Sequence, residues 1–526
     1  MMQKARCFSW RMGMILFFLL LTVGCANPKA KWGTTLIYPT MRYGIQPGKQ
    51  TLEFNSYPKD IKEEEALYAD VEIVDAGKKD VFHKKVEIKN NRYCVDVDLP
   101  EGRYVAKLTL LPAKCKAKVK MNVVKPRDYA QVTVDGRGRF RVNGKPFLPV
   151  GIYSNMDWPE FKPYNNKWRE YDTKTIIEDS PFNVLLPYDG LWWSLEKPDV
   201  KGLEATQVML DILQKNGKMV FLSVKDFHPK SIKEKDGIKG ALNITRNAVE
   251  KFRDHPALLG WYVNDESDVG KYEAEQAELV GMLDPYHPSL QVQFKWNLQE
   301  TCLNGSDIYG LDFYPIDKAD SNQAAVRWLF ECHARAFGSS HGVPVCGVPQ
   351  MFSWHAYDRN RTKYRPSMAQ MRSTALMMAA CGARSFIFYA HQGLVKMVEP
   401  FGIGFEELWK EACELGQMMR DLEPYLLGDP LPIAPSLEVR SGTPKVRILT
   451  SNAGRRAVVI STEGETQTTD VVFSLDRTRS FRSKYGKTKS LGDGKYQFTC
   501  EYMDGDVLEE VVSKYMDGDV PEEVAP

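Results

Sequence analysis

Cysteine is sparse in this chain, and its spacing follows no known motif. Ten cysteines occur among 526 residues, and none forms a C-x-x-C pair. This argues against a zinc site of that kind and against a dense disulfide framework. Cys94 and Cys115 lie in neighbouring strand-like segments, and their positions allow a disulfide.

A block of charge of one sign is also lacking. The formal net charge is +2, and no run of like charges interrupts the sequence. Such a chain offers no electrostatic footprint for a nucleic acid or an acidic polymer, so no nucleic-acid partner is expected. The apolar fraction of 43% and the charged fraction of 26% are those of a globular protein. At 526 residues the chain exceeds the usual size of one hydrophobic core, which predicts several domains.

The N-terminus has the pattern of a targeting segment. Lys4, Arg6 and Arg11 precede the apolar run MGMILFFLLLTVG, which stops at Cys25. A basic start, a short apolar core and small residues predict an export signal, and the run is too short for a comfortable membrane span. LTVGC resembles a bacterial lipobox, which implies a lipid anchor on Cys25; the alternative is a plain secretory signal. By resemblance to sorted lipoproteins, Ala26 implies the outer membrane of a Gram-negative cell, on its periplasmic or surface side.

Changes of periodicity divide the rest of the chain. Two regions alternate apolar and polar residues between turn signals, which predicts antiparallel β-sandwiches, and a central region alternates apolar runs with amphipathic helical stretches. The predicted segments are a signal at 1–25, a β-sandwich at 31–126, the central domain at 132–426, a second β-sandwich at 431–512 and an acidic tail at 513–526.

The C-terminal end contains an internal repeat. YMDGDVLEEV at Tyr502 recurs as YMDGDVPEEV at Tyr515. The D-x-D fragment occurs in calcium loops, but the other ligands of such a loop are missing. A solvated acidic tail is therefore the expectation.

The central region contains eight apolar runs, and a helical stretch follows each of them. Asn143-Gly144, a strong hairpin signal, precedes the first run, FLPVGIYS. Strands that are apolar without alternation imply a parallel sheet covered on both faces, and eight such units predict a closed (β/α)8 (TIM) barrel. An open doubly wound sheet would require a glycine-rich phosphate turn after the first strand, and VGIYSNMDW is not one.

Polar and aromatic residues stand where the predicted strands end. Reactive groups of such barrels gather at this face. In chain order the rim carries Tyr153, Tyr188, Asp189, Lys225, Asp226, Asn264, Asp265, Glu266, Trp296, Asp312, Tyr314, Gln350, Phe352, Trp354, Tyr389 and His391. Aromatic faces stack on sugar rings, and amides and carboxylates bind hydroxyl groups. Because no Ser-His-Asp order, metal-binding histidine pair or phosphate cradle accompanies them, we expect a carbohydrate substrate and no cofactor or metal.

The fourth run has the most specific motif. HPALLGWYVNDES, together with VNGKPFLPVGIY before the first strand, resembles the large clan of (β/α)8 glycoside hydrolases, in which strand four ends in Asn-Glu or Asp-Glu. The resemblance implies that Glu266 is the general acid/base and that Asp265, or Asn264 in another register, contacts the sugar's 2-substituent. The local chemistry agrees, because Trp261 and Tyr262 would desolvate the Glu266 carboxyl, and Asp265 would raise its pKa further.

The seventh run departs from this family pattern. Retaining members place a nucleophilic glutamate there, where this sequence has Gln350. Another carboxylate can take the part, with Asp312 and Asp226 best placed and Asp189 behind them, either as nucleophile or as base in an inverting reaction. The alternatives are a substrate acetamido group oriented by Asp265, or loss of catalysis, which would leave a glycan-binding lipoprotein. An aldolase using Lys225 is a third class.

Overall fold

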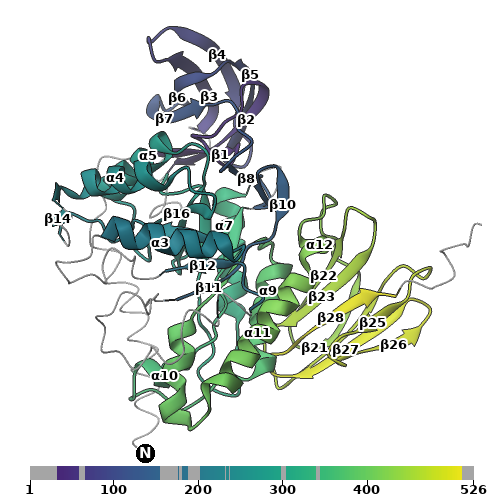
Figure 1. Ribbon diagram of the computed structural model, residues 1–526. Coiled ribbons are helices and arrows are strands. Elements are labelled where there is room, and N and C mark those ends of the chain that lie inside the picture. Colours follow the sequence, from purple (N-terminus) through teal and green to yellow (C-terminus); the bar gives the residue numbers. More distant parts are fainter. Residues whose placement is uncertain are drawn as a thin grey trace, which may run out of the picture.

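The computed structural model describes residues 32–58, 66–154, 176, 180–187, 202–230, 233–235, 237–297, 304–338 and 344–511. A β-domain precedes a central barrel, and a second β-domain follows it (Figure 1). Several predicted features lie outside the described residues, namely the export signal with Cys25, the rim residues Tyr188 and Asp189, and the acidic tail.

The central domain is a closed ring of eight parallel strands, which confirms the predicted (β/α)8 barrel. Strand β20 pairs with β11, through Val150 and Phe386, and so closes the ring. The strands are β11 (Val150–Tyr153), β12 (Val184–Leu186), β13 (Met219–Ser223), β16 (Leu258–Asp265), β17 (Ser289–Gln293), β18 (Ile308–Leu311), β19 (Val345–Gly347) and β20 (Phe386–Phe388). They are buried on both faces, as parallel strands under a layer of helices are.

Helices pack around the ring and share one apolar core with it. They are α3 (Gly202–Lys215), α4 (Ala241–Phe252), α5 (Lys271–Leu283), α7 (Ala324–Phe337), α8 (Trp354–Tyr357), α9 (Met368–Ala380), α10 (His391–Phe401), α11 (Phe405–Asp421) and α12 (Glu423–Leu426). A short hairpin, β14 (Glu234–Lys235) and β15 (Ile238–Lys239), precedes α4. In the described part of the chain, no helix is long and apolar enough to span a membrane.

The N-terminal domain consists of two antiparallel sheets, ordered β1-β2-β5 and β4-β3-β6-β7, that enclose an apolar core of their own. Its strands are β1 (Trp32–Tyr38), β2 (Gly48–Pro58), β3 (Ala66–Asp75), β4 (Asp80–Glu87), β5 (Arg92–Leu99), β6 (Gly102–Pro112) and β7 (Cys115–Val123). Cys94 and Cys115 belong to different sheets and are free thiols, so the disulfide that their sequence positions allow is absent.

A three-stranded sheet leads into the barrel. It contains β8 (Val132–Val134), β9 (Phe140–Val142) and β10 (Lys145–Phe147). Asn143 and Gly144, both at positive φ, form the turn between β9 and β10, where the sequence predicts a hairpin.

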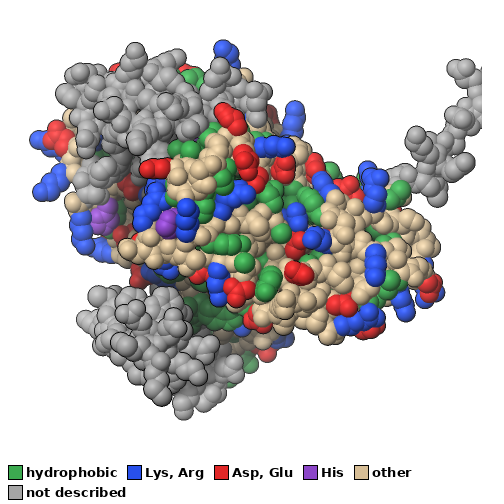
Figure 2. Space-filling view, turned by 90° about the horizontal axis from the view of Figure 1, so that it is seen from below, with side chains coloured by type: hydrophobic (Ala, Val, Ile, Leu, Met, Phe, Trp, Pro, Cys, Tyr) green, Lys and Arg blue, Asp and Glu red, His purple; other side chains and the backbone are tan. Residues whose placement is uncertain are grey.

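The C-terminal domain is the second flanking β-domain, with sheets ordered β21-β24-β27-β26 and β22-β23-β28-β25. Its strands are β21 (Leu437–Ser441), β22 (Pro444–Thr450), β23 (Arg456–Thr462), β24 (Thr468–Ser474), β25 (Phe481–Ser483), β26 (Thr488–Gly492), β27 (Lys495–Glu501) and β28 (Gly505–Glu510). On the face shown in Figure 2, its basic and acidic side chains are interspersed.

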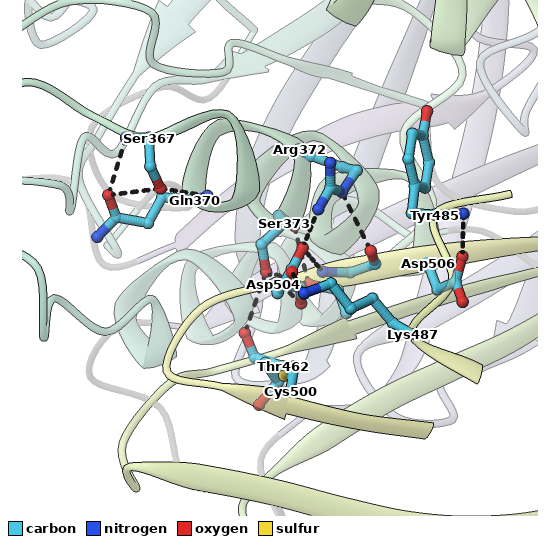
Figure 3. A network of polar contacts seen from close by, with 12 residues as sticks. Ser367, Gln370, Arg372, Ser373, Thr462, Tyr485, Lys487, Cys500, Asp504 and Asp506 are labelled. Carbon is cyan, nitrogen blue, oxygen red and sulfur yellow. Dashed lines mark hydrogen bonds and ion pairs between the residues drawn. The ribbon is translucent and has the colours of Figure 1, made fainter. Parts of the chain in front are cut away.

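A buried polar network joins this domain to the barrel (Figure 3). Arg372 of α9 pairs with Asp504 at 2.5 Å, and Lys487 contacts the other oxygen of the same carboxylate at 3.0 Å. Asp504 and Asp506 come from the first copy of the repeat, and both are buried. The first copy is therefore an interface strand and not a solvated segment. The described residues contain no group of side chains suited to hold a metal ion.

Candidate active site

A cavity of about 240 Å³ opens at the carboxyl ends of the barrel strands. Three carboxyl groups and six aromatic rings line it. The residues are Tyr153, Asp265, Glu266, Asp312, Tyr314, Phe352, Trp354, Tyr357 and Tyr389. They follow β11, β16, β18, β19 and β20, so side chains far apart in the sequence meet at one mouth, where reactive groups of such barrels gather.

The end of β16 is irregular, and this brings two adjacent carboxyls to the same cavity. Neighbours in a regular strand point to opposite faces. Here the pairing with β17 shifts register between Tyr262 and Asn264, and Glu266 takes a φ of 50°. The buried Asn264 side chain donates to the Ser267 carbonyl at 2.7 Å and accepts from the Asp265 amide at 3.0 Å. Asn264 thus shapes the turn and does not itself line the cavity.

Buried tyrosines hold the side chain of Asp265 in place through hydrogen bonds. Its Oδ1 accepts a 2.5 Å hydrogen bond from the Tyr262 hydroxyl, which in turn accepts one from Tyr153 at 3.3 Å. Burial raises the pKa of both tyrosines well above the usual value, so both hydroxyls keep their protons. Lys225 Nζ lies 3.9 Å from Asp265 Oδ2. The carboxylate is therefore held in place by a donor and a cation.

Glu266 and Asp312 are two carboxyls that line the same cavity. Burial raises the pKa of Asp312 well above its usual value, and the charge of Glu266 adds to this effect. Glu266 is an exposed residue, yet the cavity walls lie close enough to its carboxyl to raise its pKa by desolvation. Asp265 also raises the pKa of Glu266, whereas Asp312 and the charge of Lys295 lower it. On balance the pKa of each group is raised, which favours its protonated form.

Asp312 Oδ1 is buried and has no hydrogen-bond partner among the described residues. That Asp312 is catalytic stays a prediction.

Aromatic rings from the last strands form the rest of the wall. The rings of Tyr314 and Tyr389 stack with centroids 5.4 Å apart, and Phe352 meets Trp354 edge to face at 5.0 Å. Strand β20 lies opposite β16 in the ring of eight, so Tyr389 faces the carboxyl side of the cavity. Tyr357 was not among the predicted site residues. It lies one turn of α8 after Trp354, and residues three apart share one face of a helix, so this spacing could have indicated that both rings face the cavity.

Gln350 does not line this cavity. The side chain is fully buried. Its Oε1 accepts from the Ile316 amide at 2.9 Å, and its Nε2 donates to the carbonyls of Ile316 and Phe352 at 2.8 and 2.9 Å. Gln350 therefore clamps the loop after β18 against the end of β19.

The other rim residues that the structure describes also lie outside the cavity lining. Asp226 accepts a 2.9 Å bond from Lys225. His391 begins α10, packs against Phe405 and Trp409, and has its pKa lowered to about 4 by burial. Trp296 is an exposed residue that contacts Trp328, with centroids 5.9 Å apart.

Comparisons with known proteins give only distant likenesses. No protein-family model and no curated protein sequence matches the chain. The β-glucuronidase of Parabacteroides merdae is 11% identical with a TM-score of 0.33, covering 91% of this chain and 74% of that one. The Bifidobacterium dentium β-glucuronidase complexed with coumarin-3-O-glucuronide is 14% identical (69% and 60%, TM-score 0.34), and the Dictyoglomus thermophilum β-D-glucuronidase is 12% identical (69% and 62%, TM-score 0.32). At these values the likeness carries no conclusion about substrate or activity.

Proposed function

We propose that this protein is a glycoside hydrolase in which Glu266 donates the proton to the leaving glycosidic oxygen. One observation carries the proposal: a carboxyl with a raised pKa stands at the mouth of an aromatic-lined cavity, at the face of the barrel where strands end. A second carboxylate, Asp265, lines the same cavity. Aromatic faces and fixed carboxylates suit the C–H and O–H groups of a sugar.

The chemistry follows from the positions of these groups. Glu266 hands its proton to the glycosidic oxygen as the bond to the anomeric carbon breaks, and the leaving group departs as an alcohol. Positive charge develops on the sugar ring as that bond breaks, and water finally adds to the anomeric carbon, directly or after a covalent intermediate, to give the free sugar. Asp265, held by Tyr262, stabilises that charge because its orientation is fixed before the reaction. Asp312 lines the same cavity, and burial raises its pKa, so it favours a protonated carboxyl beside Glu266.

We propose that the second carboxylate of the reaction is one of the predicted candidates Asp312, Asp226 and Asp189. Asp312 lines the cavity with Glu266. Asp226 accepts a bond from Lys225, whose Nζ also lies 3.9 Å from Asp265 Oδ2. Asp189 lies outside the described residues. Product configuration, followed by NMR during early turnover, separates retention from inversion, and the Asp→Asn variant that abolishes turnover identifies the second carboxylate. Turnover confined to 2-acetamido glycosides and unaffected by all three variants contradicts a second carboxylate from this set.

The central test uses Glu266→Gln on a panel of 4-nitrophenyl glycosides that includes glucuronides and 2-acetamido sugars. We expect kcat/KM to fall about 10²–10⁴-fold. The loss should shrink on 2,4-dinitrophenyl glycosides, whose leaving group needs no proton. Glu275→Gln, an exposed residue of α5, is the matched control and should behave as wild type. Equal losses with both leaving groups would contradict the acid role.

A catalytically inactive glycan-binding protein is the second candidate. It is favoured by the amide of Gln350 at a strand end where the resembling clan has its nucleophile, and by its backbone clamp. This candidate predicts retention on a glycan column without turnover, and wild-type retention for Glu266→Gln. Any turnover that Glu266→Gln removes rules it out.

We also propose that the protein is exported and anchored to the cell envelope by lipid on Cys25. The support is the sequence pattern alone, since these residues lie outside those described. Incorporation of radiolabelled palmitate into the expressed protein, lost in Cys25→Ser, is the expected result. Export with no label would indicate a plain secretory signal.

A further inference from the structure

A second cavity, of about 340 Å³, lies where the base of the barrel meets the C-terminal domain. Its walls come from α7, the end of α9, the residues before β20, the linker after α12, and β22. Arg384 precedes β20, so the cavity is at the amino ends of the strands. Glu266 stands at the opposite face, and the two sites are separate.

Arg384 is the unusual residue of this cavity. It is only 6% exposed. Its NH1 group donates to the carbonyls of Ala383 at 2.7 Å and Ala379 at 3.4 Å, at the end of α9. No carboxylate of the described residues is within ion-pair distance of it, and these two bonds use only part of its five N–H groups. A buried cation without an anion is costly unless something compensates it.

Further cations surround the same space. Lys445 and Arg447 alternate along β22 and so present their side chains on one face. Arg137 lines the cavity as well. Burial first, then the charges of Arg139 and Arg137, lower the pKa of Arg384 to about 10, and the charge of Asp135, which is not within ion-pair distance, offsets only part of this. Glu331 is the one carboxylate in the described lining, and Arg327 already pairs with it at 2.9 Å. The cavity therefore has an excess of positive charge.

We propose that this cavity binds a phosphate- or sulfate-type oxyanion. Guanidinium groups match the oxygens of such anions in pairs, and Arg384 has donors left to offer. The anion would supply the missing counter-charge and would connect the barrel to β22. The volume exceeds that of a bare oxyanion, so a sugar carrying a phosphate or sulfate ester also fits.

The experiment measures anion binding to the full chain by calorimetry, with inorganic phosphate and inorganic sulfate as probes and chloride at matched ionic strength as reference. We expect binding that weakens with added salt. Lys445→Gln/Arg447→Gln should weaken it about tenfold or more, since each charge-assisted contact is strong. Arg482→Gln/Lys489→Gln removes two exposed cations of the same domain and should leave it unchanged.

Two further arms complete the test. Arg384→Met should abolish binding; if this variant does not fold, the double variant on β22 still decides. Glucose 6-sulfate identifies the source of the anion: tighter binding than inorganic sulfate assigns the cavity to esterified sugars, and equal binding to the free ion. Failure of every anion to bind beyond the chloride reference, or equal weakening in both double variants, overturns the proposal. Glycosidase activity has no part in these readouts.

Discussion

Glu266 and Gln350 both follow strands of the same barrel at the same rim, and the structure treats them in opposite ways. Glu266 is exposed, has a left-handed backbone and lines the cavity. Gln350 is fully buried, and its three hydrogen bonds all go to backbone groups. A position at the end of a strand thus brings a residue to the rim of the barrel. The local backbone conformation then determines whether its side chain points into the cavity or packs against the protein.

The largest effect on stability is expected when the amide of Gln350, which holds the two backbone segments together, is replaced by a carboxylate. In Gln350→Glu the two carbonyls of Ile316 and Phe352 lose their donor and face a buried negative charge. The free energy of unfolding should fall by about 3 kcal/mol or more. Urea denaturation followed by tryptophan fluorescence measures it. Gln467→Glu, at an exposed loop position, is the matched control, and an equal loss there would show that charge alone is responsible.

The next effect concerns the buried carboxyl of Asp312. The folded pKa of Asp312 is raised, so its contribution to stability is fully present below the unfolded pKa of about 3.9 and is lost as pH rises through the folded value. Each tenfold gain in proton affinity on folding corresponds to about 1.4 kcal/mol of this contribution. Asp312→Asn should flatten the pH dependence above pH 4, as measured by urea midpoints at several pH values. A slope as steep as that of wild type would contradict a raised pKa for Asp312.

The smallest effect tests the backbone of Glu266. A non-glycine residue at a φ of 50° has a conformational cost of about 1 kcal/mol, which glycine avoids. Both Glu266→Gly and Glu266→Ala remove the carboxyl, so their difference isolates the backbone. We expect the free energy of unfolding, measured by urea denaturation, to be about 0.5–1 kcal/mol larger for the glycine variant than for the alanine variant. Both variants should lack activity. An alanine variant of equal or higher stability would show that the turn carries no such cost.

The sequence was sufficient for the barrel and for the position of Glu266 at its mouth, because both depend on local patterns. Eight apolar runs without alternation required a sheet covered on both faces, and the motif at Glu266 marked the mouth. The complete burial of Asp312 beside the exposed Glu266 was not predictable, because it depends on how the ends of β16 and β18 converge in space. The clamp by Gln350 depends likewise on a backbone approach that no spacing encodes.

The first copy of the internal repeat lies within the β-sandwich predicted at 431–512, but its contact with the barrel was not predictable. D-x-D in an acidic context is typical of a solvated segment, yet Asp504 is buried against Arg372 of α9. The partner lies 132 residues away in the chain. The local sequence pattern therefore does not determine whether such a segment is exposed or buried, because its burial depends on contacts with the neighbouring domain.

Strand β28 belongs to a ten-residue segment that occurs twice in the chain with one substitution. Leu508 of the first copy is fully buried and paired on both sides, with Val458 of β23 and Ser483 of β25. The equivalent residue of the second copy is Pro521. Proline has no amide hydrogen and is excluded from the middle of a sheet. Proline at the position equivalent to Leu508 therefore makes the second copy a poorer central strand than the first, which favours the first copy as the strand between β23 and β25.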